Sequence, residues 1–133
     1  MSITSRFIVI CERAFTAAGT NNLSLINIFT QINANQFPFV HPQFAVVVNF
    51  DTTETGAHTL RIRVTGPDRN QVAQSDLPVT THANNWQVIA NYEHFTFAAP
   101  GTYTFAVEME GVALGERSLQ VVKVGDARKT AVA

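Results

Sequence analysis

The chain has 133 residues, a length typical of one domain. Only 14% of them are charged and 46% are hydrophobic, so Thr, Asn, Gln and Ser must form much of the surface, as in many β-proteins. A net charge of −1 supplies no field that would attract a phosphate backbone or an anionic bilayer, which argues against nucleic acid and membranes as partners.

The first apolar segment, Phe7–Phe15, and the second, Leu23–Ile32, are separated by a cluster of turn-forming residues at 17–22. This arrangement predicts a β-hairpin. In the second segment, apolar residues occupy both alternating sets, so we expect a strand that is central in its sheet or covered on both faces. The next segment, Asn33–Pro42, contains two prolines and is expected to be an extended crossover between sheets rather than a paired strand.

Alternating apolar residues predict strands at Gln43–Asp51 and at His58–Thr65, and a turn at 66–70 leads to a short strand at Gln71–Ser75. Residues 76–85 are expected to be irregular. From Trp86 the even positions are apolar, but Phe95 and Phe97 occupy odd positions. The change of phase predicts a bulge or a sharp bend near Glu93–His94.

Two strands close the chain, at Tyr103–Glu110 and at Leu114–Val124. The total is seven to nine strands with no window of helical periodicity. We therefore predict an all-β chain, an immunoglobulin-like antiparallel β-sandwich over residues 1–125, followed by a short polar C-terminal tail at 126–133.

The segments Phe95–Phe97, Pro100–Phe105 and Glu108–Gly111 resemble the late strands of bacterial immunoglobulin-like sandwiches, in which a Pro-Gly corner precedes a strand that opens with tyrosine. Together with the order of the earlier apolar segments, they make the chain similar to a family of small uncharacterised bacterial and phage proteins. The earlier segments are Ile8–Glu12, Leu23–Phe29, Phe37-Pro38 and Phe44–Val48. This resemblance implies a sandwich fold and a bacterial or phage origin, and it implies no catalytic residue.

Few residues suggest chemistry. Cys11 is the only cysteine, so no intramolecular disulfide can form, and a cysteine in an apolar strand is usually a small buried residue. The four histidines share no metal-ligand spacing, and Glu108 and Glu110 are expected on a solvated face opposite Arg61 and Arg63. We therefore expect no catalytic residue, no metal site and no cofactor.

Aromatic residues beside the irregular segments are the candidate binding residues. Phe37, Phe39 and Trp86 could form an exposed platform of the kind that stacks on sugars, although plugging the ends of the sandwich is the more frequent role of such rings. His94 joins them because it lies at the predicted irregularity.

Three functions remain open. A structural or protein–protein assembly module is favoured by the low charge, the apolar strands and the lack of chemistry; its partner would be another protein or a second copy of the chain. A carbohydrate-type binding module is the alternative, and a small enzyme is the least favoured. The N-terminal apolar stretch is interrupted by Glu12 and Arg13 and lacks a cleavage site, so it predicts a first strand rather than a signal peptide. The expected location is the cytoplasm or a virus particle.

Overall fold

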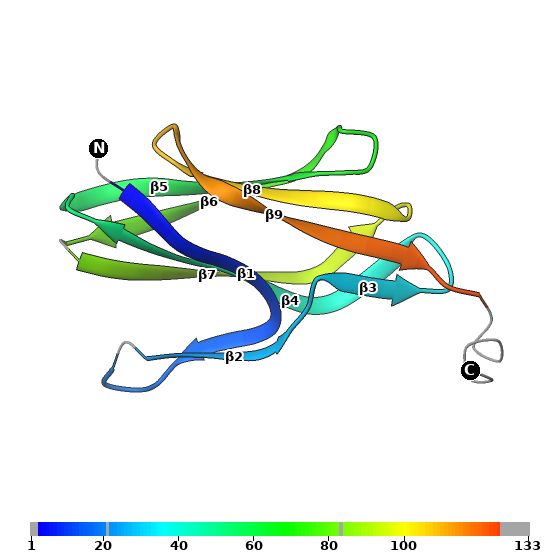
Figure 1. Ribbon diagram of the computed structural model, residues 1–133, viewed down its shortest axis with the longest axis horizontal. Helices are drawn as coiled ribbons and strands as arrows, with labels where there is room; N and C mark the ends of the chain where they lie inside the picture. Colours follow the sequence, from blue (N-terminus) through cyan, green and yellow to red (C-terminus); the bar gives the residue numbers. More distant parts are fainter. Residues whose placement is uncertain (1–2, 21, 83, 126–133) are drawn as a thin grey trace.

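The computed structural model describes residues 3–20, 22–82 and 84–125. They form nine strands in two facing layers (Figure 1). In chain order these are β1 (Ile3–Thr16), β2 (Leu23–Ile28), β3 (Gln31–Ala34), β4 (Phe39–Thr52), β5 (Gly56–Thr65), β6 (Gln71–Thr81), β7 (Asn84–Phe97), β8 (Gly101–Met109) and β9 (Val112–Lys123). No helix among the described residues is long and apolar enough to cross a membrane. The predicted tail, 126–133, lies outside these ranges.

One sheet has the order β2-β1-β4-β7 and the other β3-β9-β8-β5-β6. Neighbours are antiparallel except β3 and β9, which are parallel. β4 and β7 share one layer, whereas β5, β8 and β9 share the other. In an immunoglobulin domain, strands B and E likewise lie in one sheet and strands C, F and G in the other. The predicted immunoglobulin-like sandwich is confirmed.

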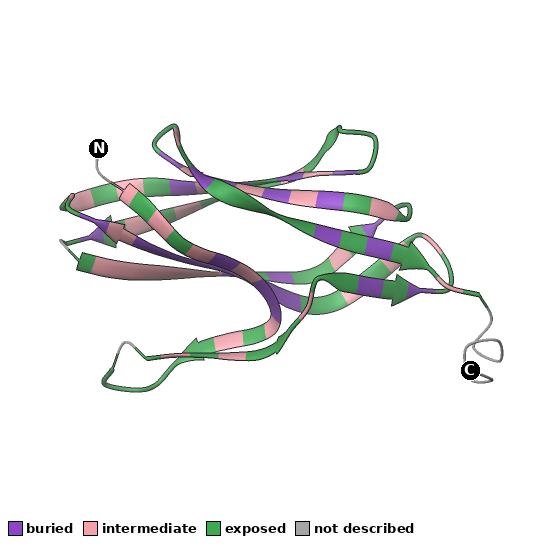
Figure 2. Cartoon of the chain, in the orientation of Figure 1, coloured by how far each residue is buried: buried purple, intermediate pink, exposed green. Residues whose placement is uncertain are grey.

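The core lies between the sheets, because each strand alternates and turns its apolar set inward. Its members include Ile8, Ile10, Phe44, Val46, Val48, Phe50, Leu60, Ile62, Val64, Phe97, Phe105, Val107, Leu119 and Val121. Phe44 is fully buried and stacks on Tyr92, with ring centroids 5.0 Å apart. Buried and exposed bands alternate along the strands in Figure 2.

A tyrosine corner joins the two layers where β8 begins. The Tyr103 hydroxyl donates a hydrogen bond to the Ala99 carbonyl oxygen at 2.7 Å and accepts one from the Ala99 amide at 3.3 Å. The predicted Pro-Gly corner precedes it, and Gly101 has a φ of 140°, which L side chains rarely adopt.

The first third of the chain differs from the prediction. The expected strand Leu23–Ile32 is divided into β2 and β3, which lie in different sheets. β2 ends its sheet and is not covered on both faces: its residues are exposed or half-buried. Asn33–Pro42 does cross between sheets, but its two ends are paired, in β3 and in β4. Pro38 lies between the two strands, and Pro42 lies in the first part of β4, which pairs with β7 but not yet with β1, whose pairing reaches only to Ala45. A proline is tolerated where the strand has a neighbour on one side only.

The strand β6 is also longer than predicted. It runs to Thr81 along the edge of its sheet, so most of the segment expected to be irregular is paired with β5. Pro78 is accommodated because β6 has a neighbour on one side only.

The phase change near His94 is present. His94 has a left-handed φ of 52°, and both Glu93 and His94 are exposed between buried Tyr92 and half-buried Phe95. The opposite strand changes phase at the same point, since Pro42 and Gln43 are both exposed next to buried Phe44. The pairing of β4 with β7 keeps its register across this point. The irregularity is therefore a local bend shared by two strands, without the extra residue of a bulge.

Candidate interaction surface

The four predicted binding residues do not form one platform. Phe37 and Phe39 are half-buried and pack against the core. Phe39 pairs with Phe97 near the end of β7, whereas Trp86 lies near the start of β7 and pairs with Phe50. Phe39 and Trp86 are therefore separated by 11 residues along β7, or roughly 36 Å. Trp86 is also half-buried, and its indole nitrogen donates a hydrogen bond to the His82 carbonyl oxygen at 2.8 Å.

A groove of about 450 Å³ lies where the hairpin, β3 and β4 meet. Its lining is half aromatic or apolar and half polar: Glu12, Asn27, Phe29, Gln31, Ile32, Asn33, Phe39 and His41. Phe39 is the one lining residue that the sequence suggested. The alternation of amides with apolar residues in Asn27–Asn33 was the signal that could have indicated the others.

Within the groove, burial lowers the pKa of the His41 imidazole below its usual value, and the nearby Glu12 carboxylate opposes this only in part. The ring of His41 is parallel to that of Phe29, at 11° with centroids 5.8 Å apart, and meets Phe39 edge-on at 6.0 Å. The three rings come from two separate segments of the chain.

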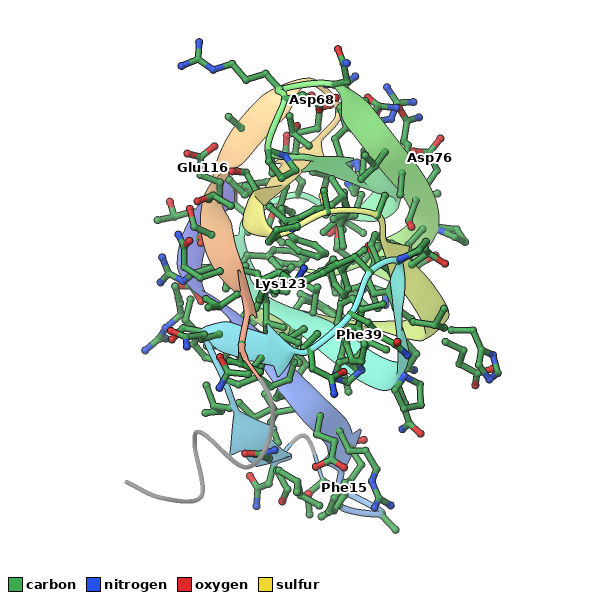
Figure 3. The ribbon with its side chains drawn as sticks, turned by 90° about the vertical axis from the view of Figure 1, so that its right-hand side faces the viewer. Phe15, Phe39, Asp68, Asp76, Glu116 and Lys123 are labelled. Atoms are coloured by element: carbon green, nitrogen blue, oxygen red, sulfur yellow. The ribbon has the colours of Figure 1, made fainter. Side chains whose placement is uncertain are left out.

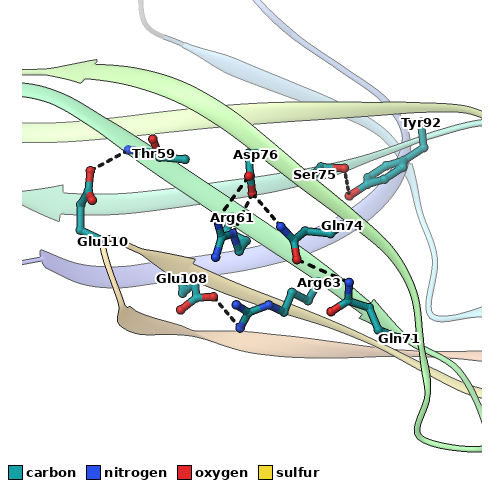
Figure 4. Close-up of polar contacts among 10 residues, drawn as sticks. All are labelled: Thr59, Arg61, Arg63, Gln71, Gln74, Ser75, Asp76, Tyr92, Glu108 and Glu110. Carbon is teal, nitrogen blue, oxygen red and sulfur yellow. Dashed lines mark hydrogen bonds and ion pairs between the residues drawn. The ribbon is translucent and has the colours of Figure 1, made fainter.

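The charges on the outer face of β5, β6 and β8 are paired with one another (Figure 4). Arg63 contacts Glu108 at 2.7 Å, as expected, but Arg61 forms its ion pair with Asp76 on β6, at 2.8 Å. Glu110 instead accepts a hydrogen bond from the Thr59 amide at 2.9 Å. Two ion pairs therefore neutralise four of the five charges named on this solvated face, and exposed pairs of this kind contribute little to stability.

The described residues that could act as nucleophiles or metal ligands do not lie together in one site. Cys11 is fully buried, and burial raises the pKa of its thiol, which disfavours the reactive thiolate. Among the described residues, no three His, Cys, Asp or Glu side chains are placed to share a metal ion.

The hairpin formed by β1 and β2 carries an exposed apolar surface. Phe15 is 50% exposed, Ile26 42% and Ile28 57%. Phe15 lies at the far end of this hairpin in Figure 3, and the hairpin projects beyond the sandwich in Figure 1. We call these three residues the hairpin patch.

Other apolar residues of the hairpin are used internally. Ala14, Leu23 and Leu25 pack against a second small core of Cys11, Ala45 and Val47. The hairpin is therefore held against the body of the protein by Leu23 and Leu25 while the hairpin patch remains in solvent. Exposed large apolar side chains on one short hairpin are a feature of many interaction sites.

The four sheet edges differ in how well they resist pairing with another chain. β3 has four residues; β6 carries Pro78 and Asp76; β7 carries exposed Glu93 and left-handed His94. Short strands, prolines, charges and irregular backbone all discourage edge pairing. β2 contains no charged residue and no proline, and Asn27, with a φ of 56°, is its single irregularity.

Comparisons with known proteins give a family and a similar solved structure. Among curated proteins, none matches this sequence. The chain is similar to a solved structure described as an immunoglobulin-like protein from Pseudomonas aeruginosa, with 14% identity, a TM-score of 0.46, and coverage of 92% of this chain and 98% of that one. Residues 6–122 match the model of DUF6941, which is described as a family of unknown function, and the chain belongs to that family.

Proposed function

We propose that this protein is a non-enzymatic assembly module that docks through the β1–β2 hairpin, and that its partner is a second copy of the same chain. The observation that carries the proposal is the hairpin patch, which lies beside the uncharged edge of β2. A projecting strand with apolar side chains and a free edge offers both backbone hydrogen bonds and burial to a partner strand.

A second copy fits this edge because the edge is compatible with itself. Two β2 strands related by a twofold axis would pair antiparallel, and each copy would present the same residues to the other. Leu23–Ile28 contains no charge, so the two strands would meet without like-charge repulsion. The nearest charged side chains, Glu12 and Arg13, have opposite signs.

The expected affinity is modest. Full burial of an Ile or Phe side chain contributes about 1.5–3 kcal/mol, so covering the exposed half of each contributes about 1 kcal/mol. Six such side chains in a dimer give roughly 6 kcal/mol, which is comparable with the entropic cost of association. Backbone pairing along β2 must supply the surplus, so we expect dissociation constants of about micromolar or weaker.

Sedimentation velocity over a range of protein concentrations tests the proposal. We expect a reversible monomer–dimer equilibrium that Ile26→Asp or Ile28→Asp shifts to monomer. Val72→Asp is the matched control, because Val72 is 51% exposed on β6, away from the hairpin. A wild-type protein that stays monomeric at high concentration, or an equilibrium that all three substitutions change equally, would overturn the proposal.

The proposal includes no reaction. It is supported by the burial of Cys11 and by the mutual pairing of the charged groups on the outer face of β5, β6 and β8. We place the assembly in the cytoplasm or in a virus particle of bacterial or phage origin. Immunogold labelling of cells and of purified particles tests this location.

A further inference from the structure

We propose that the groove between the hairpin, β3 and β4 binds a neutral sugar unit. This site is separate from the hairpin patch, since none of Phe15, Ile26 and Ile28 lines it. Its volume of about 450 Å³ lies within the range of small-ligand pockets.

Aromatic rings supply one half of the recognition. Phe29, Phe39 and His41 form a cluster in which two rings are parallel and the third is perpendicular. All three residues are half-buried and line the groove, so their rings are fixed by packing and still reach its surface. Rings held in this way offer apolar surface to the C–H face of a pyranose at little entropic cost.

Two amides of β3 supply polar groups among the lining residues. The Gln31 side-chain nitrogen donates a hydrogen bond to the Asn33 side-chain oxygen at 2.8 Å. That bond leaves the Gln31 oxygen as an acceptor and the Asn33 nitrogen as a donor. A donor and an acceptor of this kind match two neighbouring hydroxyl groups, each of which can both donate and accept.

A second pair of polar lining residues comes from β1 and β2. The Asn27 side-chain nitrogen donates a hydrogen bond to one Glu12 carboxylate oxygen at 3.4 Å. The other carboxylate oxygen can accept from a hydroxyl group, and hydrogen bonds to a charged acceptor are among the stronger ones. Asn27 holds a left-handed backbone, which Asn tolerates better than most residues and which places it opposite Glu12.

The charge of the groove selects against other ligands. The eight lining residues include no Lys or Arg, so phosphate and carboxylate groups have no cationic partner there. Glu12 is the one carboxylate among the eight lining residues, and a single carboxylate supplies too little negative charge to hold a metal ion such as Ca²⁺. Burial lowers the pKa of His41, which favours the neutral form of its ring. A neutral, hydroxyl-rich ligand is the class that these groups satisfy together.

An NMR titration tests the site directly. The probes are the methyl glycosides of glucose, galactose, mannose and N-acetylglucosamine, and the readout is the side-chain NH₂ signals of Gln31 and Asn33. We expect at least one glycoside to shift both signals with saturation in the millimolar range, which corresponds to about 4 kcal/mol. Gln31→Ala and Asn33→Ala should each weaken binding by about tenfold, the loss of one hydrogen bond.

Gln74→Ala is the matched control, because it removes an exposed amide from β6 and should leave the affinity unchanged. Phe29→Leu should abolish binding by removing a ring while keeping an apolar side chain. The amide variants change exposed residues, so they keep the test decisive even if Phe29→Leu misfolds. The inference is overturned if none of the four glycosides shifts these signals, or if both amide variants bind the glycosides as tightly as the wild type.

Repeating the titration with the Ile26→Asp variant separates this inference from the proposed self-association. Glycoside binding that persists in a protein that stays monomeric shows that the groove functions without the dimer. Binding lost in this variant would mean that the groove is completed by a second chain, which contradicts a site formed within one copy.

Discussion

Replacing Tyr103 by Phe removes the hydroxyl group of the tyrosine corner and keeps the ring. The ring is 2% exposed and packs edge-on against Phe97, with centroids 4.9 Å apart, so the apolar contacts should survive the change. Two hydrogen bonds are lost, to the carbonyl oxygen and to the amide of Ala99, at 2.7 and 3.3 Å.

The expected cost follows from these two bonds. A hydrogen bond contributes about 0.5–1.5 kcal/mol net, so the pair contributes about 1–3 kcal/mol. Ala99 itself is exposed, and water can replace part of what its backbone loses. We therefore expect the free energy of unfolding to fall by about 1–2 kcal/mol, toward the lower end of that range.

Urea unfolding followed by tryptophan fluorescence measures this change. With m-values of about 1–3 kcal/mol per molar, the midpoint should fall by roughly 0.5–1 M. Tyr92→Phe is the control, because the Tyr92 hydroxyl accepts one long hydrogen bond, from Ser75 at 3.4 Å, and its loss should cost less. If Tyr103→Phe were no more destabilising than Tyr92→Phe, the corner would not stabilise the sandwich as described.

Three further predictions concern single groups. The pKa of His41 is lower in the folded chain than its usual value of about 6.5 in the unfolded chain. Below about pH 6.5 the unfolded chain therefore binds more protons than the folded chain, so the free energy of unfolding is highest above that pH and falls as the pH is lowered through it. His41→Gln should flatten the dependence of the urea midpoint on pH between about 7.5 and 5.5, and a dependence as steep as in the wild type would refute this reasoning. Cys11 should react with Ellman's reagent slowly in the native state and rapidly in urea, because it is fully buried and its thiol pKa is raised; equal rates would contradict this burial. Gly101→Ala should destabilise more than Gly56→Ala by about 1–3 kcal/mol, because the two glycines have similar φ angles, 140° and 134°, but only at Gly101 would a Cβ lie 2.6 Å from Pro67; similar urea midpoints for the two variants would refute the clash.

Strands with one buried face could be predicted from the sequence. His58–Thr65 corresponds closely to β5, because Leu60, Ile62 and Val64 face the core while the residues between them face solvent. The tyrosine corner was equally visible, since it needs only residues that are adjacent in the chain.

The segment Leu23–Ile32 misled for a physical reason. Apolar residues on both sides suggested a covered strand, but Leu23 and Leu25 pack against a small second core, whereas Ile26 and Ile28 are exposed. An apolar side chain in solvent and one in a minor core look alike in a sequence, because the pattern records polarity and not contact.

The groove was largely hidden for a different reason. Glu12 lies on β1, Gln31 on β3 and His41 on β4, and only the folded topology brings them together. Phe39 was identified from its aromatic ring and its place in a proline-containing segment. The amides were overlooked because a single Gln or Asn carries no signal until its neighbours are known.

The path of the chain between the sheets has a mechanical consequence. It passes from one layer to the other five times, between β2 and β3, β3 and β4, β4 and β5, β6 and β7, and β7 and β8. Neither layer is therefore a continuous piece of polypeptide that could detach and refold alone. A pulling force applied at the two ends would meet both layers at once, so the sandwich should rupture in a single step rather than peel apart sheet by sheet.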